Sequence, residues 1–223
     1  SMTMKDSSSA SAHADLLDTI LPADSVIFLN NDETAFPLLY MQAAEGRRLD
    51  VMPAFGLLMG QPHSCAAIRK YWPERLPLES ELWSRPGMTA EERRIGFFIA
   101  MVRHGAGRWP LLWDHTGRNV GDMDPDLFFP YYHLAMIAPP GRTDIRERWM
   151  GRGDAASLYA LFQLFLEPRE AYYGSDTFAF WRLARWPLGT TAVIYGWGDD
   201  PDAFELIISL ALIYVPDDPF LLY

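Results

Sequence analysis

A strand–helix–strand pattern near the N-terminus constrains the fold of this chain more than any other feature. The apolar run 25–29 has the residue types that favour strands. Apolar side chains at helical spacing follow over residues 34–45, and Pro37 falls in the first turn, where a proline costs no hydrogen bond. A second β-type run follows at 49–52. Because a crossover of this kind joins parallel strands, we predict that 25–29 and 49–52 lie side by side and parallel.

Further strands and helices are expected after and before this unit. The expected helices cover residues 14–21, 64–72 and 89–105, and the expected strands lie within residues 108–114 and 131–140. The segment 131–140 also fits a short buried helix. Pro53, which follows the second run, favours a strand that is short, broken or at a sheet edge. The alternation of strands and helices predicts an α/β domain over residues 14–140, with a small, mostly parallel, Rossmann-like sheet and flanking helices.

The two ends of the chain differ from this domain in composition. Residues 1–13 are small and polar, which is typical of a disordered leader or an expression tag. Beyond residue 140 the sequence turns aromatic, and three apolar blocks each begin near an aspartate, the residue type that favours a helix N-cap. We therefore expect an all-α region over residues 141–223.

Charge and cysteine content exclude several classes of function. The 223 residues include 29 acidic and 19 basic side chains, for a formal net charge of −10. That balance disfavours a nucleic-acid binder and a partner of anionic membranes. The only cysteine, Cys65, cannot form an internal disulfide or a cysteine zinc cluster, and we expect it to be a buried small hydrophobe.

The longest apolar stretch, 204–215, is too short to span a bilayer and is typical of a buried helix. No signal peptide is apparent.

The acidic turn after the first strand is the candidate site. Ligands of open α/β sheets bind beyond the carboxyl ends of strands, and the turn is expected there. Its residues are Asn30, Asn31, Asp32, Glu33 and Thr34. Carboxylates and amides suit sugar hydroxyls, whereas a phosphate would be repelled and would find no glycine-rich loop. The alternative is structural: Asp32 or Thr34 caps the helix, and Glu33 lies at the positive end of its dipole.

No other group in the sequence has the spacing of a catalytic or metal site. The histidines are scattered, and the alternating aspartates 122, 124 and 126 lack the glycine and terminal glutamate of a calcium loop. We expect no cofactor and no metal. Most of the eight tryptophans are expected in the core, with a minority free to stack on sugars or to dock a partner.

The stretch from the first strand through "TAFPLLYMQAAEGRRLDV" resembles the soluble part of the membrane protein O-mannosyltransferase-like family. The matching residues are Asp32, Thr34, Phe36, Pro37, Leu38, Tyr40, Gln42, Glu45, Gly46, Arg47 or Arg48, Asp50 and Val51. The resemblance is good over residues 14–60 and looser to about 140, and "YVPDDPFLL" resembles a tetratricopeptide boundary. The turn departs from the family pattern, which has glycine and more aspartate where this chain has Asn30–Glu33.

The resemblance implies a membrane-associated parent protein with a multi-span, glycosyltransferase-like region that carries the catalytic acid. This chain would then be a non-catalytic, extracytoplasmic accessory or docking domain with tetratricopeptide-like helices after it. Its partners would be the membrane region of its own parent and a protein or glycan acceptor. Two alternatives stay open: a free-standing small α/β enzyme acting on a sugar or nucleotide through residues 31–33, and a helical-repeat interaction module. Either could be cytoplasmic.

Overall fold

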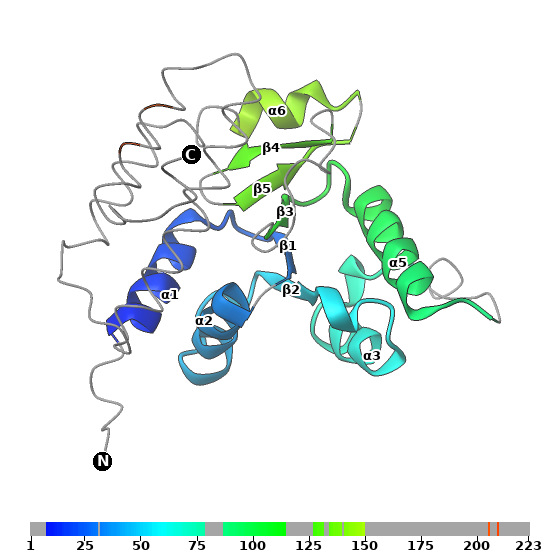
Figure 1. Cartoon of the computed structure of the whole chain (residues 1–223), viewed down its shortest axis with the longest axis horizontal. Coiled ribbons are helices and arrows are strands. Elements are labelled where there is room, and N and C mark those ends of the chain that lie inside the picture. Colours follow the sequence, from blue (N-terminus) through cyan, green and yellow to red (C-terminus); the bar gives the residue numbers. More distant parts are fainter. Residues whose placement is uncertain are drawn as a thin grey trace.

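The computed structural model shows a five-stranded sheet with helices on both faces (Figure 1). It describes residues 8–30, 32–78, 87–114, 127–131, 134–139 and 141–149, with the single residues 205 and 209. The elements in chain order are α1 (Ser8–Ile20), β1 (Val26–Leu29), α2 (Asp32–Ala44), β2 (Met52–Phe55), η2 (Gly56–Leu58), α3 (Pro62–Tyr71), η3 (Pro73–Arg75), α5 (Ala90–Gly105), β3 (Leu111–Trp113), β4 (Phe128–Tyr131), β5 (Leu134–Ile137) and α6 (Thr143–Trp149).

The predicted strand–helix–strand unit is confirmed. β1 and β2 pair in parallel, with Val26 opposite Met52, and α2 joins them. The second strand begins at Met52 rather than at Leu49, because the chain after α2 first passes through a loop that includes the left-handed residue Arg48. β2 is an edge strand, as Pro53 suggested, since a proline has no backbone N–H to donate and is tolerated where that side of the strand has no neighbour.

The expectation of a mostly parallel sheet is wrong. The strand order is β2-β1-β3-β5-β4, in which β1 pairs in parallel with β2 and β3, while β5 pairs antiparallel with β3 and β4. The segment 131–140 was expected to hold one strand or one short helix. It holds the last residue of β4 and all of β5, with only two residues between the strands. A connection that short allows only an antiparallel pair.

Two hydrophobic cores lie on the two faces of the sheet. Alternate residues of β1 supply both: Ile27 and Leu29 belong to one core, and Val26 and Phe28 to the other. α1 and α2 cover the first face, and α3 and α5 cover the second (Figure 1). The alternation follows from the two-residue period of a strand, so one apolar run can be buried on both sides.

The helices agree with the local signals in most places, but Pro37 lies inside α2, which begins at Asp32, and not in its first turn as expected. Thr89 and Glu92 form the expected reciprocal capping box at the start of α5. α3 confirms the helix expected over 64–72. α1 begins at Ser8, before the start expected at Ala14, and so includes the last part of the segment 1–13. α6 lies at the start of the region expected to be all-α, ahead of its three apolar blocks. None of the helices within these described ranges is long and apolar enough to cross a membrane.

The all-α region expected over residues 141–223 lies almost wholly outside the described residues. The structure therefore confirms a mixed α/β fold for the preceding part of the chain.

Candidate functional site

The first part of the acidic turn lies where β1, β2 and β3 end together. Asn30 directly follows β1, and its amide Nδ2 donates a hydrogen bond to the backbone carbonyl of Asp114 at 2.7 Å. Asp114 directly follows β3 and is fully buried. Gly56 directly follows β2, and a Cβ atom placed on it would lie 2.6 Å from Oδ1 of Asn30. The side chain of Asn30 therefore contacts the carboxyl ends of both neighbouring strands.

This position is the topological switch point of the sheet. From β1 the chain passes through α2 to β2 on one side, and β3 lies on the other side of β1. Open α/β sheets bind ligands at such a point. Here the amide of Asn30 spans it, so a ligand entering between β1 and β3 would compete with an existing hydrogen bond.

The other predicted site residues do not form one accessible surface. Asp32 is the first residue of α2 and is exposed, whereas Thr34 lies in the same turn and is 1% exposed. Asn31 and the side chain of Glu33 lie outside the described part of the chain. A carboxylate at a helix start is stabilised by the helix dipole, so Asp32 has a structural role whether or not it meets a ligand.

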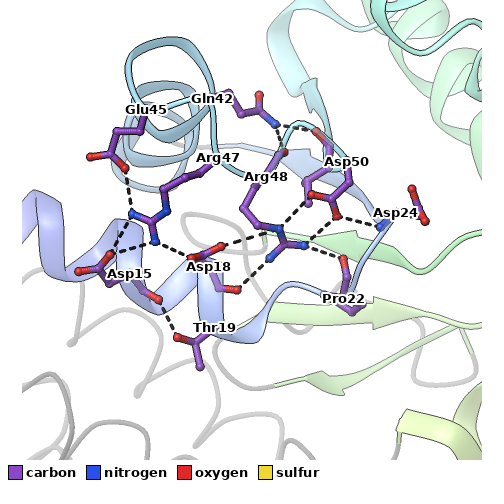
Figure 2. A network of polar contacts seen from close by, with 11 residues as sticks. Asp15, Asp18, Thr19, Pro22, Asp24, Gln42, Glu45, Arg47, Arg48 and Asp50 are labelled. Carbon is purple, nitrogen blue, oxygen red and sulfur yellow. Dashed lines mark hydrogen bonds and ion pairs between the residues drawn. The ribbon is translucent and has the colours of Figure 1, made fainter.

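A second polar cluster lies at the amino ends of β1 and β2, and we call it the arginine clamp (Figure 2). Its members are Asp15, Asp18, Pro22, Asp24, Gln42, Glu45, Arg47, Arg48 and Asp50. Most of them belong to the stretch that carries the family resemblance. They were not predicted to act together, although two adjacent arginines followed by an aspartate are a visible signal.

Arg48 is at the centre of the arginine clamp. Its guanidinium donates to the backbone carbonyls of Asp18 at 2.9 Å and Pro22 at 3.0 Å, and to both carboxylate oxygens of Asp50 at 3.1 Å. The residue has φ of 52°, in the left-handed region that non-glycine residues seldom adopt. The side chain thus ties the end of α1 to the loop before β2.

Gln42 and Arg47 complete the clamp. The amide of Gln42 donates to the carbonyls of Arg48 at 2.8 Å and Val51 at 2.7 Å, which fixes the loop that leads from α2 into β2. Arg47 donates to the carboxylates of Asp15, Asp18 and Glu45. Its side chain is about one-third exposed, so these ion pairs are worth less than the bonds of the more buried Arg48.

Charges in the clamp shift two pKa values. Hydrogen bonds to Asp18, Glu45 and Asp15, in that order, raise the pKa of Arg47. Burial by itself would raise the pKa of Asp50, but the bonds from Arg48 and from the backbone N–H of Asp24 outweigh it and lower that pKa below its usual range. Asp50 therefore stays ionised wherever the clamp is folded at neutral pH.

The remaining chemical candidates fall into two groups. Cys65 is buried among apolar side chains of α3 and α5, which confirms the expected small hydrophobe. The aspartates 122, 124 and 126 lie outside the described residues. Within the parts of the chain that the structure describes, no group of three histidine, cysteine or acidic side chains is arranged to hold a metal ion.

Comparison with known proteins adds no identification. No protein-family model, no curated protein sequence and no solved structure matches this chain.

Proposed function

We propose that this chain is a non-catalytic accessory domain that docks on the membrane region of a glycosyltransferase-like parent protein, on its extracytoplasmic side. Its partner in that position would be a protein or glycan acceptor. The support comes from the positions of the residues in the resembling stretch. Some are buried or bonded within the fold, and others are exposed on the outer face of α2.

The inward and polar residues of this stretch serve the fold. Leu38 and Met41 are fully buried in the core between α2 and the sheet. Gln42, Arg48 and Asp50 form the arginine clamp. Side chains that are engaged in this way hold the strand–helix–strand unit together.

The outward apolar residues of the same stretch have no comparable role, and they are the observation that carries the proposal. Phe36 is 62% exposed and Tyr40 is 58% exposed. They are four residues apart on α2, so they share one face of the helix. Large apolar side chains grouped on a helix surface are typical of an interaction site. α2 is thus apolar on both its core face and its outer face, as expected for a helix that lies between a sheet and a partner.

The region beyond residue 140 has a place in this proposal. As an all-α, tetratricopeptide-like segment it would extend the docking surface, since stacked helical repeats present broad concave surfaces to partners.

The test removes the apolar face of α2. The domain, expressed as a separate chain, should co-purify with the membrane region of the parent protein. Phe36→Ser combined with Tyr40→Ser should abolish this co-purification. The matched control is Ile95→Ser combined with Ile99→Ser, because these residues are also four apart and exposed, at 49% and 42%, but lie on α5. Both double variants should keep the far-ultraviolet spectrum of the parent chain.

Two results would contradict the proposal. One is undiminished co-purification by the α2 double variant. The other is a complete gene that encodes no membrane-spanning segments.

A free-standing enzyme is the second candidate, and the polar switch point favours it. Asn30, the exposed Asp32 and the buried Asp114 lie at the carboxyl ends of β1 and β3, where α/β enzymes place their sites. Turnover of a lipid-linked sugar or a glycoside by the purified chain, abolished by Asp32→Asn, would establish this function in place of docking.

A further inference from the structure

A pocket opens at the amino ends of β1 and β3, at the opposite end of the sheet from the acidic turn. Its volume is about 470 Å³, within the range of small-ligand sites. The side chains that matter here are Asp24, Trp72, Glu74, Arg75, Arg108 and Trp109. They come from the loop before β1, from the segment after α3 and from the loop between α5 and β3, so the fold assembles the pocket from segments far apart in sequence.

One wall of the pocket is held rigidly by Arg75. The residue is 7% exposed, and its guanidinium donates to the carbonyl of Ser25 and to a carboxylate oxygen of Asp24, both at 2.9 Å. Asp24 has φ of 58°, and its backbone N–H donates to Asp50 at 3.0 Å. The conformation of Asp24 is thus fixed by the arginine clamp behind it, and a fixed polar wall binds ligands without a large cost in entropy.

Another part of the pocket lining carries a cation stacked on an indole. The guanidinium of Arg108 lies 4.5 Å from the ring centroid of Trp109, and its Nη1 is 3.1 Å from Nε2 of His104. Among the residues that the structure describes, no carboxylate forms an ion pair with Arg108. The exposed Glu74 of the same pocket forms no ion pair with a described cation either. The pocket therefore offers a donor group on Arg108 and an acceptor group on Glu74 that no ion pair between described residues occupies.

The guanidinium of Arg108 and the carboxylate of Glu74 together determine which class of ligand the pocket can bind. An anion would be attracted by Arg75 and Arg108 but repelled by Glu74 and Asp24, and a cation would meet the reverse. A hydroxyl group both donates and accepts, so it can bond to a carboxylate and to a guanidinium at once. The apolar face of a pyranose ring can pack against an indole such as that of Trp72, which is half-buried at the edge of the pocket. We infer that this pocket binds a neutral saccharide.

The inference deepens the proposed function and rests on it only for the source of the saccharide, a glycan of the acceptor. The pocket and the Phe36–Tyr40 face of α2 lie on different elements, so binding and docking can fail separately. The α2 double variant should bind saccharides as the unmodified chain does.

The test measures binding of defined probes to the purified chain. Saturation-transfer NMR and calorimetry would be run with methyl α-mannopyranoside, methyl α-glucopyranoside, methyl β-galactopyranoside and inorganic phosphate. At least one pyranoside should bind, and phosphate should not compete. Arg108→Gln and Glu74→Gln should each weaken binding by about tenfold, the effect of losing a hydrogen bond to a charged group. Arg103→Gln is the matched control, because Arg103 is an exposed arginine of the last turn of α5 that does not line the pocket.

Different results support and overturn the inference that the pocket binds a saccharide. Weaker binding by both pocket variants with normal binding by Arg103→Gln supports the inference. Failure of every pyranoside to bind, retention of binding in both pocket variants, or displacement of the sugar by phosphate overturns it, and the last result would identify an anion site instead. None of these outcomes depends on co-purification with a membrane region.

Discussion

The two ends of β1 use polar side chains in opposite ways. At the carboxyl end, Asn30 bonds to the backbone beside the buried Asp114, and Gly56 makes room for it. At the amino end, Arg108 and Glu74 are exposed around an open pocket of about 470 Å³. The first group satisfies polar atoms of the fold, whereas the second leaves charged atoms available to solvent.

This difference shows why residue type alone does not locate a site. Amides and carboxylates at the carboxyl end of a strand are the usual sign of an α/β ligand site. A polar group that already bonds to the backbone is part of the fold, and its removal costs stability first. Stability and binding should therefore respond differently to substitutions at the two ends of β1.

We expect the largest loss of stability from a substitution in the arginine clamp, which supports the amino end of β1. Arg48→Ala should lower the free energy of unfolding by about 2–4 kcal/mol, because it leaves two backbone carbonyls without this donor and Asp50 without its guanidinium partner. Arg48→Lys should cost less, since a lysine keeps the charge but cannot bond in a bidentate manner. Urea unfolding would measure both. Equal stability of Arg48→Ala and the unmodified chain would show that the clamp does not hold this end together.

The next largest loss of stability is expected at the carboxyl end of β1. Gly56→Ala should cost about 1–3 kcal/mol, because the new methyl group would lie 2.6 Å from Oδ1 of Asn30 and 3.1 Å from the carbonyl oxygen of Leu29. Gly96→Ala is the control: it lies within α5 with nothing nearer than 3.8 Å, and it should stabilise the chain by about 0.5–1 kcal/mol. Thermal unfolding would compare the two. A neutral Gly56→Ala would mean that Asn30 is free to move toward a ligand.

Asp50 gives the clamp a pH dependence. Its folded pKa is lowered, so the stability that it contributes is fully present above its unfolded pKa of about 4 and is lost as pH falls through the folded value. The stability difference between the unmodified chain and Asp50→Asn should therefore shrink as the pH is lowered from neutral to below about 4. Urea titrations across that range would measure it, and a constant difference would contradict the role given to Asp50.

The smallest expected effect is at Asp32. As the first residue of α2 it gains only from the helix dipole, so Asp32→Ala and Asp32→Ser should cost similar amounts, about 0.3–1 kcal/mol. Clear rescue by serine relative to alanine would instead show that Asp32 caps the helix through its side-chain oxygen. Neither substitution should change saccharide binding at the amino end, and loss of binding in both would move the ligand site to the acidic turn.

Much of the architecture could be predicted where neighbouring residues decide it. The strand–helix–strand unit, the edge position of Pro53 and the capping box of Thr89 all follow from periodicity, a missing N–H and a contact three residues away. The site could not be predicted in the same way. The bond from Asn30 to Asp114 joins residues 84 apart, and the pocket brings Asp24 to Arg75 across a separation of 51.

The order of the amino acids is thus enough to specify which of these segments become strands and helices, because burial on a two-residue or 3.6-residue period is a local property. It also determined that β1 and β2 run parallel, since the helix between them leaves no other short path. Long-range contacts set the direction of β5 against β3 and which end of the sheet stays open. Both depend on which distant side chains meet: Asn30 finds a carbonyl at one end, while Arg108 at the other finds an indole and no described carboxylate.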